Sequence, residues 1–127
     1  MTPTTKSKTL KARLLLLTFV GGAVGSVLRY AISLGLSLPV WLWVVNLLGA
    51  LVLGFVQVNK RFSRAEAQSL IATGFAGGFT TLSSLITFGM LGNDPNFIYL
   101  AQQIGAGVAV YWLGRILGGE RSWPSTW

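Results

Sequence analysis

Four long hydrophobic runs, separated by short polar stretches, dominate the chain. We predict that they form helices over about residues 14–36, 40–58, 67–91 and 97–117. Each run reaches the roughly 20 mostly apolar residues that a helix needs to cross the hydrocarbon core of a bilayer. Pro39 marks the turn after the first run, and GNDPN, which is rich in turn-forming residues, precedes the fourth. The pattern predicts an all-α integral membrane protein with four transmembrane helices.

The two ends of the chain are polar. Residues 1–13 are basic, and we expect them to form a mostly disordered cytoplasmic leader. Residues 14–118 would then be a four-helix membrane domain, and residues 119–127 a cytoplasmic tail. Lys11 and Arg13, placed before an apolar run, also resemble the start of a signal peptide. Three further apolar runs follow, so cleavage is the less favoured interpretation.

Basic residues are distributed unevenly between the loops. Of the ten Lys and Arg residues, nine lie in the leader, the second loop and the C-terminal part from the end of the fourth helix onward, and Arg29 lies inside the first helix. The positive-inside rule then places both termini in the cytoplasm, for a multi-pass protein of the cell inner or plasma membrane. The basic residues do not alternate with aromatic residues, so a membrane explains them better than a nucleic acid does. The nine are Lys6, Lys8, Lys11, Arg13, Lys60, Arg61, Arg64, Arg115 and Arg121.

The residue types present exclude several kinds of chemistry. The chain has no Cys and no His, and its acids are Glu66, Asp94 and Glu120. Ser83 or Thr81 would therefore lack a base to activate it as a nucleophile, and an enzyme is the weakest hypothesis. A transporter of the small multidrug resistance type, also four-helical, needs a carboxylate within a span, and no acid lies in one here. The absence of such an acid and of nucleotide-binding motifs favours passive transport.

The segment GFAGGFTTLSS lies midway along the third hydrophobic run. Gly77 and Gly78 are poor helix formers, and hydroxyl residues follow them that can bond to freed backbone groups. We predict a helix broken near its middle, which inside a bilayer would indicate an ion site. An intact helix, with glycines at a crossing point and hydroxyls bonded back to the preceding turn, is the alternative. The hydroxyl residues are Thr80, Thr81, Ser83 and Ser84.

Two further polar residues lie inside predicted spans. The side-chain amide of Asn46 can donate two hydrogen bonds, which suits a small desolvated anion, although such a residue also commonly joins helices. Arg29 lies in the later part of the first helix. It could form an electropositive vestibule, or it could anchor the helix by extending toward the outer interface. The residues alone leave both questions open.

The segments GGAVGSVLRY, VVNLLGALVLG and TGFAGGFTTLSS together resemble the CrcB/Fluc fluoride channel family. The resemblance implies an antiparallel dual-topology dimer with fluoride pathways between its subunits. It also implies a central sodium ion held by the backbone carbonyls of Gly77 and Thr80. Asn46 would be a donor in the anion pathway, which would also include Thr81, Ser83 and Ser84, and Arg29 would match the arginine of the family's first helix.

The chain departs from the family pattern in ways that affect function. Leu82 and Leu85 occupy the positions of two phenylalanines whose positive ring edges can face an anion, and Phe88 is three residues out of register. The fourth helix carries Val108 and Trp112 near places where the family has serines. A homodimer of opposite orientations also needs balanced loop charges, which this chain lacks. We therefore expect one half of a heterodimer for passive fluoride export, which lowers cytoplasmic fluoride, with a non-conducting structural subunit as the alternative.

Overall fold

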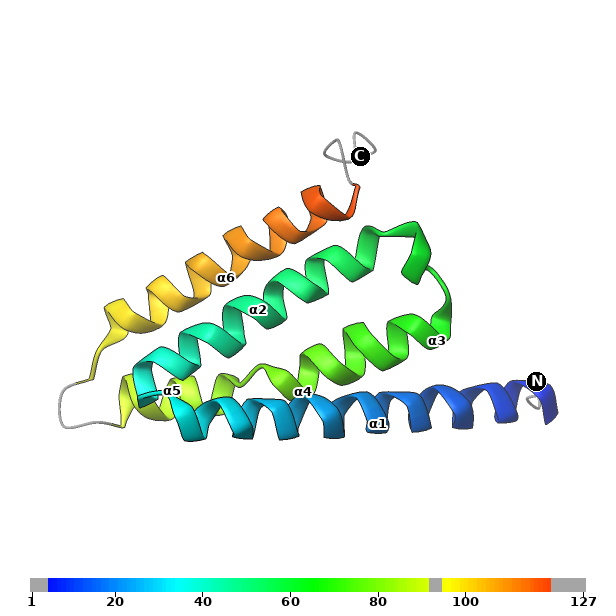
Figure 1. Ribbon diagram of the computed structural model, residues 1–127, viewed down its shortest axis with the longest axis horizontal. Helices are drawn as coiled ribbons and strands as arrows, with labels where there is room; N and C mark the ends of the chain where they lie inside the picture. The colour runs from blue at the N-terminus through cyan, green and yellow to red at the C-terminus, as the bar shows by residue number, and fades with distance from the viewer. Residues whose placement is uncertain (1–4, 92–94, 120–127) are drawn as a thin grey trace.

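The computed structural model describes residues 5–91 and 95–119, and the regular structure in these ranges is helical (Figure 1). The third predicted helix consists of several consecutive pieces between Ala65 and Met90, which we call helix three. In chain order the elements are α1 (Thr5–Gly35), α2 (Leu38–Val58), the 3-10 turn η1 (Lys60–Phe62), α3 (Ala65–Ala67), the π-helical η2 (Gln68–Ala76), α4 (Gly77–Phe79), α5 (Leu82–Met90) and α6 (Phe97–Gly118).

Within the described ranges, three helices are long and apolar enough to cross a membrane: α1, α2 and helix three. The fourth predicted helix is present as α6, whose 22 residues would extend about 33 Å. It is not among these three, and the polar residues Gln102, Gln103 and Arg115 lie along it.

The four long helices lie side by side in the order α1, helix three, α2, α6 (Figure 1). Close backbone contact holds neighbouring helices together. A side chain on Gly54 of α2 would place its Cβ 2.1 Å from the carbonyl oxygen of Tyr111 in α6, so only glycine fits there. In lipid, where burying apolar surface gives helices little attraction, such small residues define the packing faces.

The predicted boundaries hold within a few residues, with two corrections. The leader is helical from Thr5 onward, because α1 begins there, so the prediction of a mostly disordered leader is wrong for residues 5–13; residues 1–4 lie outside the described part. Its Lys, Leu, Ala and Arg residues are good helix formers. Pro39 belongs to the first turn of α2 instead of marking a turn, because a proline there removes no helical hydrogen bond.

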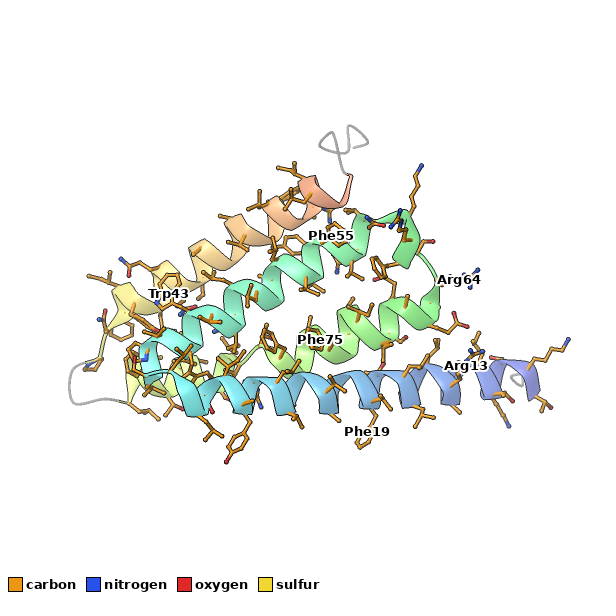
Figure 2. All side chains as sticks on the ribbon, in the orientation of Figure 1. Arg13, Phe19, Trp43, Phe55, Arg64 and Phe75 are labelled. Carbon is orange, nitrogen blue, oxygen red and sulfur yellow. The ribbon has the colours of Figure 1, made fainter. Side chains whose placement is uncertain are left out.

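Two basic residues from different elements lie at the same end of the bundle (Figure 2). Figure 2 shows Arg13 and Arg64 at one end and Trp43 at the other. Arg13 lies 3.7 Å from Glu66, which joins the beginning of α1 to the beginning of helix three. Residues 92–94 of the predicted GNDPN turn lie outside the described part; after them, Asn96 caps α6 by accepting a hydrogen bond from the Tyr99 amide at 2.9 Å.

Candidate functional site

Helix three is broken at Thr80 and Thr81, which adopt extended conformations with ψ of 159° and 111°. The predicted break is therefore confirmed, but its position differs from the expectation. Gly77 and Gly78 are helical, and the chain leaves the helix only after Phe79. A Cβ on Gly78 would lie 2.2 Å from the carbonyl oxygen of Gly22 in α1. Gly78 therefore allows helix three to pack closely against α1, and the opening of the helix lies at Thr80 and Thr81.

Asn46 of α2 bonds to the opened backbone with both ends of its side-chain amide. The Thr81 amide donates to Asn46 Oδ1 at 2.9 Å, and Asn46 Nδ2 donates to the Thr81 carbonyl at 3.5 Å. In an unbroken helix the Thr81 amide would donate to the Gly77 carbonyl four residues earlier. Asn46 thus replaces a helical hydrogen bond and joins α2 to helix three. Its Nδ2 carries a second hydrogen, which that contact does not use.

Residues of α1 donate hydrogen bonds to the backbone carbonyls near the break from the other side. Arg29 Nη1 donates to the Thr80 carbonyl at 3.2 Å, and Ser26 Oγ donates to the Gly78 carbonyl at 3.4 Å. Arg29 is half-buried and turns toward the protein interior. From the sequence, Arg29 could be an interfacial anchor or part of a vestibule. The structure gives it a third position, where it bonds directly to the broken backbone. Ser26 was not identified from the sequence at all.

Three of the four predicted hydroxyl residues form one small cluster at the start of α5. Thr81 caps this helix, since its Oγ1 accepts from the Ser84 amide at 3.3 Å and donates to Ser84 Oγ at 3.0 Å. Ser83 Oγ lies 3.5 Å from the same hydroxyl. The side chain of Thr80 turns away from the cluster and donates to the Ala76 carbonyl at 2.9 Å. Thr81, Ser83 and Ser84 are therefore brought together.

The two leucines at the aromatic positions lie in different surroundings. Leu82 is 63% exposed, whereas Leu85 is 4% exposed. Phe88, one turn further along, packs edge-on against Tyr99 of α6 with ring centroids 5.0 Å apart. In α6, Val108 is 54% exposed, and the guanidinium of Arg115 lies 5.2 Å from the ring centre of Trp112.

A cavity of about 200 Å³ lies beside the break. One residue of its wall was not predicted from the sequence. Gln103 of α6 is 3% exposed, and its Nε2 donates to the Tyr99 hydroxyl at 3.2 Å. Gln103 Oε1 is fully buried and, within the described residues, has no hydrogen-bond partner. Such an atom costs about 1–3 kcal/mol. The cavity is lined by Asn46, Thr80, Thr81, Leu82, Leu85, Gln103 and Ile104.

The sequence did contain a signal for this residue. Gln102 and Gln103 are adjacent amides in an otherwise apolar helix, and polar residues within spans commonly mark functional sites. Only the helical phase of α6 relative to α2 decides which of them faces the break. Gln102 is exposed, and Gln103 is buried against the cavity.

A second, larger cavity of about 520 Å³ adjoins the hydroxyl cluster near the beginning of α2. Its wall includes Ser83, Ser84 and Thr87 from α5 together with the rings of Trp41 and Phe88. The hydroxyl cluster therefore lies between two hollows, one of which reaches the end of the bundle where α2 begins.

An interrupted helix inside an apolar span, with its backbone bonded by polar groups of two other helices, defines the class as a multi-pass helical membrane protein. Residues 16–115 match the family model described as "CrcB-like protein, Camphor Resistance (CrcB)". The chain belongs to this family.

Curated relatives agree with this assignment. The "Fluoride-specific ion channel FluC" of Aquifex aeolicus is 37% identical over 113 residues, which cover 78% of this chain and 91% of that protein. The protein of the same name from Chlorobaculum tepidum is 34% identical over 80% of this chain and 91% of its own length. A third, from Leptospira interrogans, is 41% identical over 68% of this chain and 76% of its own length. No solved structure matches the chain significantly.

Proposed function

We propose that the chain is a subunit of a fluoride-specific channel that lets fluoride leave the cytoplasm passively. The observation that carries the proposal is the cavity beside the break, where Asn46, Thr81 and Gln103 meet without any acidic residue in the wall. Relatives that cover most of the chain carry the name of such a channel. In this proposal α6 is a fourth span and both termini lie in the cytoplasm.

The chemistry of the wall suits a small anion. Amide and hydroxyl groups can donate hydrogen bonds to fluoride as it loses water, whereas a carboxylate would repel it. Asn46 keeps one Nδ2 hydrogen beyond its contact with Thr81, and the hydroxyls of Ser83 and Ser84 continue the polar surface toward the larger cavity. The proposed pathway passes from Asn46 and Thr81 to Ser83 and Ser84.

The proposed assembly is an antiparallel dimer, and we favour two different chains. Nine basic residues on one side against none on the other favour a single orientation of this chain. A related chain of the opposite orientation would then complete the pair. Leu82 at 63% exposure leaves part of the break uncovered for such a partner. A non-conducting structural subunit is the second candidate, favoured by Leu82 and Leu85 in place of aromatic rings.

The backbone at the break fits the sodium ion that the family implies. Gly77 is exposed, and a Cβ there would meet nothing within 4 Å. Its carbonyl loses its usual helical donor, because the Thr81 amide bonds to Asn46. The Thr80 carbonyl accepts from Arg29, and a carbonyl oxygen has a second lone pair. Gly77 and Thr80 would hold the ion, which when bound would supply positive charge at the break.

A fluoride efflux assay in liposomes tests the proposal. The chain would be reconstituted alone and together with a co-expressed homologue, and efflux of fluoride compared with that of chloride. We expect fluoride-selective efflux from the mixed preparation and little from the chain alone. Conduction by a stable homodimer of this chain would overturn the heterodimer. Absence of fluoride efflux from both preparations would overturn the channel function and leave the structural subunit.

A further inference from the structure

The side-chain amide of Gln103 is held at one end only. Its Nε2 donates to the Tyr99 hydroxyl at 3.2 Å, and that hydroxyl donates in turn to the Pro39 carbonyl at 3.2 Å. The other end of the amide, Oε1, is buried without a partner within the described part of the chain. Buried polar atoms are nearly always hydrogen-bonded, so one without a partner calls for a functional explanation.

The position of this amide connects it to the cavity. Gln103 lines the same hollow as Asn46 and Thr81. In the arrangement seen, the end of the amide without a partner is an acceptor, and an acceptor would repel an anion. The two ends of a primary amide have nearly the same shape, and a half-turn about the last side-chain bond exchanges the donor for the acceptor.

We propose that Gln103 turns its amide when fluoride enters the cavity, so that its NH2 group donates to the anion. This inference rests on the proposed function, and it adds a specificity-determining residue to that pathway. Without the anion, Oε1 stays buried and has no partner within the described residues. With fluoride in the cavity, the amide turns and Nε2 donates beside Asn46, so the two amides together replace part of the anion's hydration shell.

Tyr99 makes both states possible, because a hydroxyl can donate as well as accept. In the structure Tyr99 accepts from Gln103 and donates to the Pro39 carbonyl. After the turn, its hydroxyl donates to Gln103 Oε1 instead. The ring itself stays in place between Trp43 and Phe88, with centroids 6.1 Å and 5.0 Å away. Tyr99 is therefore a positioning residue that exchanges one hydrogen bond for another.

Three substitutions separate this role from simple packing. Gln103→Leu keeps the size but removes the donor, and we expect fluoride efflux to fall about tenfold or more. Tyr99→Phe keeps the ring and the Gln103 donor but removes the hydroxyl that partners the amide, so efflux should fall by less than in Gln103→Leu. Gln102→Leu, at the exposed neighbouring position, is the matched control and should leave efflux unchanged. If Gln103 only bound α6 through Tyr99, Tyr99→Phe would lower efflux as much as Gln103→Leu does.

A binding measurement keeps this test independent of conduction. The side-chain amide signals of the four glutamines can be followed by NMR after selective ¹⁵N-glutamine labelling, with Gln103 assigned by its loss in Gln103→Leu. We expect sodium fluoride, and not sodium chloride, to shift the Gln103 signal.

The outcomes distinguish this inference from the proposed function. If the wild-type pair conducts fluoride but Gln103→Leu conducts equally, or fluoride leaves the Gln103 signal unmoved, the inference is overturned and the channel function stands. If the wild type does not conduct but fluoride shifts the signal, the channel function fails and Gln103 remains a fluoride-binding amide. If neither efflux nor a shift is seen, both fail.

Discussion

Replacing Asn46 by leucine should destabilise the break in helix three. The Thr81 amide donates to Asn46 Oδ1 at 2.9 Å, and Thr81 is only 6% exposed, so water cannot easily take over as acceptor. A buried donor left without a partner costs about 1–3 kcal/mol, and we expect Asn46→Leu to lower the free energy of unfolding by that amount. The 3.5 Å contact from Nδ2 to the Thr81 carbonyl is long and adds little.

The matched variant is Asn46→Asp, which has nearly the same shape. Its carboxylate keeps an acceptor for the Thr81 amide, so it should destabilise the protein less than Asn46→Leu does. It also places negative charge beside the cavity, and fluoride efflux should fall further than in Asn46→Leu. Asn46→Leu would then be the less stable variant, and Asn46→Asp would be the one with less fluoride efflux. A purely structural role of Asn46 would not produce this difference.

Two measurements follow these effects. Equilibrium unfolding in mixed micelles, monitored through the five tryptophans, gives the free energy of unfolding. Hydrogen exchange at the Thr81 amide gives its local protection, which Asn46→Leu should reduce and Asn46→Asp should largely keep. If Asn46→Leu had the same free energy of unfolding and the same Thr81 amide protection as the wild type, the break would not depend on Asn46.

Three further outcomes are expected. Gly78→Ala should lower the free energy of unfolding by about 1–3 kcal/mol, because its Cβ would collide with α1 backbone, whereas Gly77→Ala should not lower it in the isolated subunit. Arg29→Leu should cost about 1.5–3 kcal/mol through its hydrogen bond to the Thr80 carbonyl, and Arg29→Lys less. In this cysteine-free chain, single cysteines near either terminus should be labelled from the cytoplasmic side alone; labelling from both sides would contradict the single orientation.

The sequence predicted the existence of the break but not its position. Two adjacent glycines followed by hydroxyl residues indicated an interruption, and local chemistry was sufficient for that inference. Gly78 is helical and packs against Gly22 on another helix, and the opening lies further along, at Thr80 and Thr81. Such a contact depends on how α1 and helix three pack, which no local pattern records.

The role of Arg29 and the importance of Gln103 were hidden for a related reason. The polarity of each residue is visible in the sequence, but its partner is not. Arg29 reaches a carbonyl 51 positions away along the chain, and Gln103 faces a cavity formed largely by α2 and helix three. Spans could be predicted from hydropathy because they need only the local composition, whereas the site needs the relative rotation of four helices.

The break in helix three depends on hydrogen bonds from the neighbouring helices. Opening a helix inside an apolar span frees backbone groups that lipid cannot bond, and each costs several kcal/mol if left alone. Here α1 supplies donors to the Gly78 and Thr80 carbonyls, and α2 bonds to Thr81. The Gly77 carbonyl, on an exposed residue, loses its usual donor. Lipid cannot replace that donor; in the proposed assembly a cation or a second subunit would cover this face of helix three, and we expect the subunit to be unstable in a bilayer without one.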